Sequence, residues 1–413
     1  MSYREIVSRP VLTWGIVAVA ARMPVAMAPL ALVLLVRERP GGYTLGAVLA
    51  AVYVVGEIIG APLLGMRMRP ERARPQLAAG LAVGASGFGA LGLLHEAHPV
   101  FLGVFAFFAG AGPAAAPGGM RALLTSLVPE RAVARAMSLE SVLTFGVWAV
   151  APALTAALAL GTAPYAPLLL TAVLMAASVG GLWALPAGWA SDDTDRDGEP
   201  MLRVVSRAWP VYVTGAASLT LLALAELILP ALLEQRGLGI GWAGLLLAGF
   251  SVGSAAGAFV YGLRSWPGRL PTQSLVLLLG VSACVALVAV LPGLVWIGTG
   301  LVVAGVMQAG AMLTRNLTLR EVLPPSALAA GYSVMYAAVG AGYAASGTLA
   351  GGLLRFVAPS TAILAGVGLT LLLAGVGAVG ERGRSRTADR QASPARPSFE
   401  DGHADSPSSP SGV

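Results

Sequence analysis

The stretch from Ala47 to Arg67, AVLAAVYVVGEIIGAPLLGMR, is repeated later in the same chain. Displaced by 197 residues it aligns with GLLLAGFSVGSAAGAFVYGLR, residues 244–264, and eight of the 21 positions are identical. A second alignment, displaced by 195 residues, gives the pairs Gly110/Gly305, Leu124/Leu319, Pro129/Pro324, Ala134/Ala329 and Ser138/Ser333. Duplicated apolar segments predict a membrane protein built from two similar halves, with a binding site between them.

The composition agrees with a membrane environment. Of the 413 residues, 56% are hydrophobic and 11% are charged, whereas soluble proteins have about 25% charged residues. Counting apolar stretches of about 20 residues gives twelve spans, at 11–36, 44–66, 76–94, 99–120, 138–160, 164–187, 209–233, 241–263, 272–291, 294–314, 329–354 and 358–380. The predicted fold class is an all-α membrane protein with twelve transmembrane helices in two pseudo-symmetric six-helix bundles.

Four regions follow from these spans. We expect a first bundle over residues 1–187, a cytoplasmic linker over 188–207 and a second bundle over 208–380. Residues 381–413 are polar and rich in Ser, Pro and Arg. Such a composition buries too little apolar surface to fold, so we expect a disordered cytoplasmic tail.

The arginines predict the orientation. All 26 basic residues are Arg, and 21 of them lie in cytoplasmic segments if both termini are cytoplasmic. The positive-inside rule therefore predicts a multi-pass protein of the inner (plasma) membrane with both ends in the cytoplasm. The same bias accounts for the net charge of +6, so the lipid bilayer is an expected partner and nucleic acid is not.

Enzyme chemistry is not expected. The sequence has no Walker-type loop, so ATP does not drive the protein, and its three histidines lie outside the spans. Segments 249–253 and 87–92 fit G-x-S-x-G and G-x-G-x-x-G, but both lie within apolar spans, where small residues usually permit close helix packing. No Cys/His cluster suggests a metal, and no cofactor is expected.

Two ionisable residues lie at matched depth in the first two spans. Arg22 and Glu57 are each about ten residues from the cytoplasmic end of their spans, which places both roughly 15 Å deep. Charges inside a membrane are costly and require an explanation. We expect an ion pair that takes part in substrate or proton coupling. Alternatively, the pair only pins two helices together.

Glu226 is the third candidate for coupling. It lies about 17 residues into span 7, and no in-span arginine shares its depth. Partial desolvation there favours the protonated form, so we predict a proton-coupling carboxylate. The alternative is an interfacial Glu that reaches outer water or Arg236. The candidates for a cavity lining are Met27, Trp148, Gln308 and Tyr343, with aromatic filler as the alternative for the two rings.

With these features the chain resembles the major facilitator superfamily over about residues 11–380. The loop GMRMRPERAR, residues 65–74, is similar to the family's loop between spans 2 and 3, although Arg69 stands where the family has Asp. Gly110-Ala-Gly112 resembles the antiporter motif of span 4, but Ala106 replaces its Arg. The resemblance implies a conformational role for loop residues Gly65, Arg69, Arg74, Gly262 and Arg264.

The resemblance also implies alternating rocking of two bundles around a central site. We expect a monomeric secondary active transporter that exports a small, largely apolar or cationic organic molecule in exchange for protons. Few cavity charges and many apolar residues favour such a substrate over sugar phosphates. An uptake permease of the same fold remains the nearest alternative, and a membrane receptor or scaffold without transport is a third.

Overall fold

The computed structural model describes residues 8–187, 198–264 and 266–392. The first half consists of α1 (Arg9–Val36), α2 (Gly42–Met66), α3 (Ala73–Leu93), α4 (Pro99–Ala111), α5 (Ala116–Ser126), α6 (Val133–Gly161) and α7 (Ala166–Gly181). A short helix, α8 (Met201–Ser206), precedes the second half. That half consists of α9 (Trp209–Gln235), α10 (Trp242–Leu263), α11 (Leu270–Val290), α12 (Leu294–Val322), α13 (Leu328–Leu353) and α14 (Pro359–Ala392).

The prediction of twelve spans is confirmed. Eleven helical segments of the described chain are long and apolar enough to cross a membrane. The twelfth is α13, whose 26 residues are long enough but rich in Gly, Ala and Tyr. The fourth span is the combined segment Pro99–Ser126, which a 3-10 turn at Pro113–Ala115 divides into α4 and α5. Proline removes a helical hydrogen bond and breaks the helix there.

Two helices end beyond the predicted spans. Helix α12 continues to Val322, eight residues past the predicted end of its span. Helix α14 continues to Ala392, past the predicted start of the tail, because Glu, Arg and Ala are good helix formers. Residues 393–413 of the predicted tail and 188–197 of the predicted linker lie outside the described residues.

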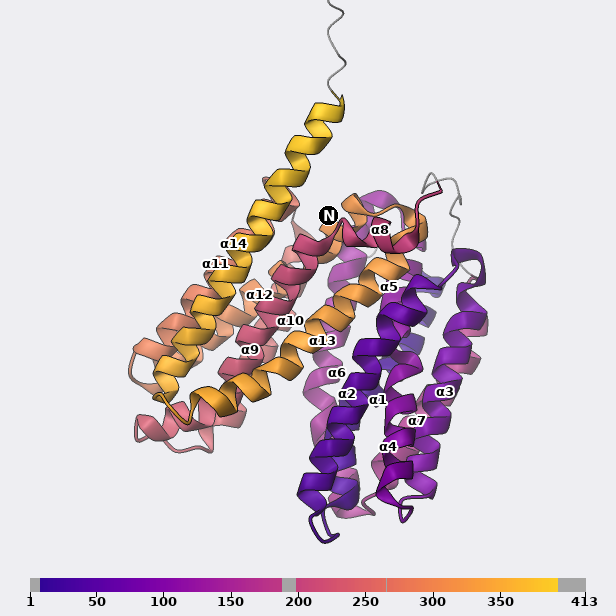
Figure 1. The fold of residues 1–413 in the computed structure, drawn as a ribbon, viewed down its shortest axis with the longest axis vertical. Coiled ribbons are helices and arrows are strands. Elements are labelled where there is room, and N and C mark those ends of the chain that lie inside the picture. Colours follow the sequence, from indigo (N-terminus) through magenta and orange to yellow (C-terminus); the bar gives the residue numbers. More distant parts are fainter. Residues whose placement is uncertain (1–7, 188–197, 265, 393–413) are drawn as a thin grey trace, which may run out of the picture.

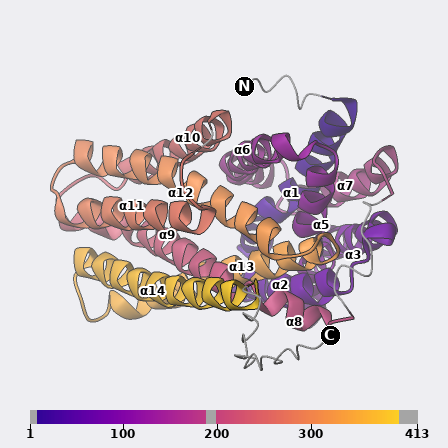
Figure 2. The same cartoon turned by 90° about the horizontal axis from the view of Figure 1, so that it is seen from above.

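The first half lies to one side of the molecule and the second half to the other (Figures 1 and 2). Helix α8, the start of α1 and the end of α14 lie at one end of the molecule, which we call the α8 end (Figure 1). The opposite end is the far end. Five helices make the main contacts between the halves, since α13 packs against α2 and α5, and α10 packs against α6.

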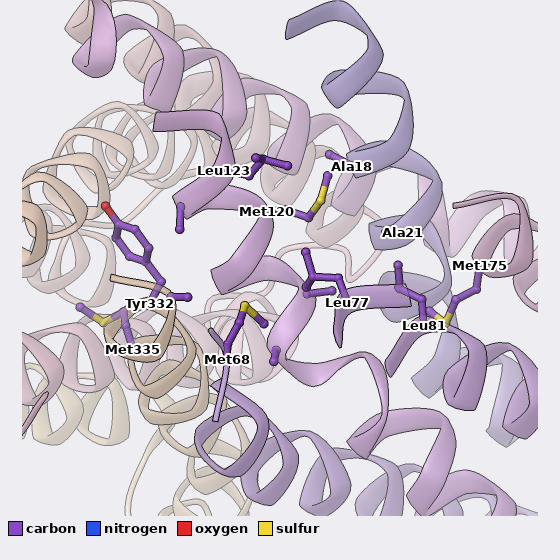
Figure 3. Packing of buried hydrophobic residues seen from close by; sticks show 14 of the residues in the cluster. Ala18, Ala21, Met68, Leu77, Leu81, Met120, Leu123, Met175, Tyr332 and Met335 are labelled. Carbon is purple, nitrogen blue, oxygen red and sulfur yellow. The ribbon is translucent and has the colours of Figure 1, made fainter. Parts of the chain in front are cut away.

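The apolar core is shared between the halves only near the α8 end. One buried cluster joins first-half residues to second-half residues within 204–212, 313–323 and 327–335. Figure 3 shows Met68 and Met120 of the first half in this cluster with Tyr332 and Met335 of α13. The far-end parts of α9 to α14 form a cluster of their own. The halves are therefore packed together at the α8 end.

Candidate functional site

Burial along the helices shows where the halves separate. In α13, every residue from Leu328 to Ser333 is buried, whereas from Tyr343 to Thr348 only Ser346 is buried. From Ala132 through the first turns of α6 to Ser141, eight of the ten residues are buried and the other two are half-buried, and the exposure rises from Gly146 onward. The junction is thus closed at the α8 end and uncovered toward the far end.

A buried charge cluster lies in the first half beside this junction. The carboxylate of Glu140 on α6 is 1% exposed and accepts hydrogen bonds from two arginines. Arg121 on α5 donates from Nε at 3.2 Å and from Nη2 at 2.7 Å, and Arg22 on α1 donates from Nη2. Arg22 also donates to Thr144 at 2.7 Å. Two guanidinium groups and one carboxylate carry a formal charge of +1, so the cluster is not neutral by itself.

The second half contacts this cluster only with uncharged groups. Arg121 Nη1 donates to Asn316 Oδ1 of α12 at 3.3 Å, and the ring of Tyr332 of α13 lies 5.4 Å from the Arg121 Cζ. Tyr332 in turn donates its hydroxyl to the Asn316 carbonyl oxygen at 3.3 Å. A cation over an aromatic face is stabilised by the ring quadrupole. Arg121 therefore links the two halves without an opposite charge in the second.

Glu57 connects the halves at a second point. Its Oε1 accepts from Tyr53 of the same helix at 3.2 Å and from Tyr336 of α13 at 2.9 Å. The predicted ion pair between Arg22 and Glu57 is wrong, because Arg22 is held by Glu140. The matched depth is nevertheless meaningful, since Arg22 and Glu57 both interact electrostatically with Tyr336.

Glu226 on α9 lies on the uncovered part of the junction. It is exposed, and it has no hydrogen bond or ion pair with the described part of the chain. Tyr343 of α13 is close enough to interact with it electrostatically. Arg236, the partner considered from the sequence, instead donates to the carbonyls of Ala289 and Leu291.

Trp148 and Tyr343 occupy matching places in the two halves. At about 100° per residue, Trp148 lies on α6 between the face that contacts α1 through Thr144 and the face that contacts α10 through Ser138. Tyr343 lies likewise on α13, between its faces toward α2 and α9. The two residues are 49% and 45% exposed. Both rings therefore face the junction without being covered by it.

The other two predicted lining residues are buried. Met27 is 0% exposed and packs with Val147 and Ala151 of α6. Gln308 is 5% exposed and accepts a hydrogen bond from Ser218 of α9 at 2.7 Å, within the second half. Neither side chain borders open space in this conformation.

The predicted loop residues have separate roles. Gly65 lies against Ser333 of the second half, and a Cβ on it would be 2.4 Å from the Ser333 Cβ. Arg74 ties the loop to the end of the sixth span by donating to the carbonyl of Leu185. Arg69 is anchored through its backbone N–H, which donates to Gln76. In the second half, Gly262 is buried in α10 and Arg264 follows that helix directly.

The sequence reasoning missed Arg121, Glu140, Asn316 and Tyr332. Arg121 was assigned to a cytoplasmic loop because the predicted span ended at residue 120, whereas α5 continues to Ser126 and buries it. The displacement of 195 residues pairs Arg121 with Asn316. That pairing of unlike polar residues was the available signal. Within the described residues, no group of His, Cys, Asp and Glu could hold a metal ion.

Comparisons with known proteins agree on the family and fold. A family model for the Major Facilitator Superfamily matches residues 14–346. No curated protein matches the chain. Many solved structures are similar to this chain, and three of them are described here. The human organic anion transporter MFSD10 (TETRAN) has 16% identity and a TM-score of 0.71, and the match covers 89% of this chain and 99% of that one.

The other two structures are bacterial. The Escherichia coli fucose:proton symporter has 12% identity and a TM-score of 0.70, with 91% of this chain and 99% of that chain covered. A bacterial homologue of the iron transporter ferroportin, in its outward-facing state, has 14% identity and a TM-score of 0.73. Here 91% of this chain and 100% of that chain are covered. At such identities the likeness shows the fold alone.

Proposed function

Because the chain belongs to the Major Facilitator Superfamily, we propose that it is a secondary active transporter that exports a small organic molecule in exchange for protons. Members of this family are transporters and not enzymes. Export, proton coupling and the substrate class are the parts that go beyond family membership. The residues at the junction of the halves support the proposed export, the proton coupling and the substrate class.

Closure at one end only is the observation that carries the proposal. The core is continuous between the halves at the α8 end, and the far-end parts of the second half pack only among themselves. The arginine bias supports a cytoplasmic α8 end. The described conformation then corresponds to a site open to the outside, and rocking of the halves would open it to the cytoplasm.

The contacts between the halves are suited to repeated opening. Besides the shared apolar core, they include small residues such as Gly65 and Ser333 in close approach, and isolated polar contacts. Within the described residues, the ion pair that joins the halves is Glu130 with Arg320, and its carboxylate side chain is 81% exposed. An exposed pair contributes at most about 1 kcal/mol. No single contact of the described junction therefore holds it shut irreversibly.

Glu226 and its surroundings favour a cationic organic substrate. An exposed carboxylate and two half-exposed aromatic rings face the junction, and aromatic faces bind organic cations. A proton and a cation would compete for the same carboxylate. Such competition produces exchange, because a proton from outside displaces the cation, the protonated carboxylate returns to the cytoplasmic side, and the proton is released there as the next cation binds.

Glu57 is the second titratable group at the junction. It lies at the closed side, where its carboxylate is bridged to the other half through Tyr336. In our proposal Glu226 exchanges the proton with the substrate, and Glu57 responds to the approach of the two halves. The absence of a nucleotide-binding loop from the sequence supports an ion gradient as the energy source.

The experiment is transport into vesicles with an imposed pH gradient and a panel of labelled organic cations, neutral compounds and anions. We expect uphill movement of a cation in the direction opposite to the protons. Glu226→Gln should fold but should bind the cation more weakly and lose accumulation driven by the gradient. Glu234→Gln, on the same helix near the far end, is the matched control and should behave like the unmodified protein.

Three results would contradict parts of this proposal. Movement of substrate with the protons would indicate an uptake permease. Normal accumulation by Glu226→Gln would transfer the coupling role to Glu57. Binding without any movement across the membrane, for every compound in the panel, would indicate a receptor or scaffold.

A further inference from the structure

A large apolar groove lies on the first half, between α2 and α3. Helices α2 and α3 both pack on α4, which forms its floor. The groove has a volume of about 530 Å³, and its lining includes Ile59, Leu64, Ala79, Phe107 and Ala111. Volumes of about 300–1,000 Å³ are typical of ligand sites.

Small residues create this space, and the second half lacks it. Gly80 and Gly112 line the groove, and a Cβ on Gly80 would be 2.5 Å from the Gly112 carbonyl oxygen. Their repeat counterparts are Leu277 and Met307. Met307 Sδ lies 2.5 Å from the Cβ position of Gly280, so the side chain fills the corresponding space.

Tyr261 completes the filling of the second half. It is the counterpart of Leu64 and, with Leu277, contacts the Cβ position of Gly310 at 3.1 Å. The same backbone arrangement therefore has two outcomes. In the second half, the chain's own side chains fill the space between the helices. In the first half, the corresponding space is left open for another apolar group.

The mouth of the groove is basic. Arg67 lines it at the α8 end, and Arg69 and Arg72 follow in the same loop. All three side chains are exposed, and none has a hydrogen bond or ion pair with the described part of the chain. The single acidic residue of this loop, Glu71, has an interaction of its own. The basic side chains are thus available to an anion outside the protein.

We propose that this groove binds an acyl chain of an anionic phospholipid, with the headgroup held at Arg67, Arg69 and Arg72. Ile59 and Arg67 are eight helical steps apart, about 12 Å at 1.5 Å per residue, against about 15 Å for half of the hydrocarbon core. An acyl chain that enters at the arginines therefore reaches nearly to the middle of the bilayer. Basic residues at the cytoplasmic surface attract anionic headgroups.

The first test fills the groove with the residues that the second half uses. Leu64→Tyr, Ala79→Val and Ala111→Val each introduce the residue that the second half has at the corresponding position. The valine at 111 should be tolerated, because Val306 packs on Gly257 in the same way as Ala111 packs on Gly60. The triple variant and the unmodified protein are reconstituted in bilayers of phosphatidylglycerol and phosphatidylcholine, and retained lipid is counted by mass spectrometry after mild extraction. We expect retained phosphatidylglycerol to fall at least fivefold.

A matched control adds similar bulk elsewhere. Val276→Tyr enlarges a 61% exposed side chain on the second half and should leave lipid retention unchanged. Equal loss in this control, or unchanged retention in the triple variant, would overturn the proposal. So would loss of transport in the triple variant with retention intact, because the groove would then serve the substrate.

The second test concerns the headgroup. Arg67→Gln combined with Arg69→Gln and Arg72→Gln should abolish the preference for phosphatidylglycerol over phosphatidylcholine, while the groove still accepts a chain of either lipid. An unchanged preference would show that the arginines do not select the headgroup. Neither test depends on the proposed substrate or on proton coupling, so the two proposals can fail separately.

Discussion

The two halves share their helix packing but not their charges. In the first half, Gly56 and Gly60 lie against the α4 backbone, with Cβ positions 2.4 Å from the carbonyl oxygens of Phe107 and Ala111. Their counterparts Gly253 and Gly257 approach Val302 and Val306 of α12 at 2.4 and 2.3 Å. The duplicated glycines therefore maintain the same close contact twice.

The polar residues are distributed differently. Arg22, Glu57, Arg121 and Glu140 of the first half have Leu219, Ser254, Asn316 and Met335 as their counterparts. At the junction the first half provides buried charges, and the second half provides the hydroxyls of Tyr332 and Tyr336 and the amide of Asn316. The comparison indicates that the repeat specifies the fold and that the differences between the halves specify the chemistry.

The largest effect is expected from Glu140→Gln. Without this carboxylate two buried guanidinium groups lose their counter-ion, and breaking a buried ion pair from one side costs about 3–5 kcal/mol. The thermal transition of the purified protein in detergent should fall accordingly. Adding Arg121→Gln to Glu140→Gln should restore part of the loss, because one uncompensated charge is then removed.

A double-mutant cycle tests the corrected pairing. Arg22→Gln and Glu140→Gln should be strongly coupled, whereas Arg22→Gln and Glu57→Gln should be closer to additive, because Arg22 pairs with Glu140 and Glu57 accepts from two tyrosines. The reverse order of coupling energies would contradict the cluster described above and return Glu57 to the role of Arg22's partner.

The next effect concerns the closed end of the junction. Gly65→Ala places a Cβ 2.4 Å from Ser333, so α2 and α13 must move apart and the closed α8 end becomes less populated. The test adds Gly65→Ala to a background that carries Cys284→Ser and Ser138→Cys. Labelling of the cysteine introduced at position 138 should then increase several-fold, and transport should decrease. Gly244→Ala, where a Cβ meets nothing within 4 Å, is the control and should change neither. Unaltered labelling in Gly65→Ala would show that this contact does not limit closure.

The smallest effect compares two hydroxyls on one carboxylate. Tyr336→Phe removes a hydrogen bond between the halves, and Tyr53→Phe removes one within α2. A hydrogen bond contributes about 1 kcal/mol, so Tyr336→Phe should increase the same labelling roughly fivefold. Tyr53→Phe should leave it unchanged. Equal effects of the two variants would mean that Glu57 is not sensing the other half.

Much of the fold could be predicted from particular residues. The repeated glycines from Gly56 to Gly65 identified the duplication, and apolar length identified the spans, because a bilayer requires about 20 apolar residues for each crossing. Residues that continue a helix beyond the apolar stretch carried no such signal. The extension of α5 past Met120 and of α12 past Thr314 was therefore missed.

The candidate site was harder to predict for the same reason. Depth along a span can be counted from the sequence, which brought Arg22 and Glu57 to one level. The choice of partner depends on which faces of neighbouring helices meet, and Glu140 was near the predicted end of its span. Arg236, considered as a partner of Glu226, donates to backbone carbonyls instead, and the proximity of Glu226 to Tyr343 was not predicted from the sequence.

The contact of Arg121 with Asn316 also bears on how such a chain arises. These two residues are related by the repeat, so in a symmetric dimer of identical half-chains each would face its own copy across the two-fold axis. Arginine would then oppose arginine, and the repulsion would keep this end apart. Joining the halves in one polypeptide allowed the two sides of the axis to diverge. The contact between Arg121 and Asn316 is one that no homodimer of either half can make.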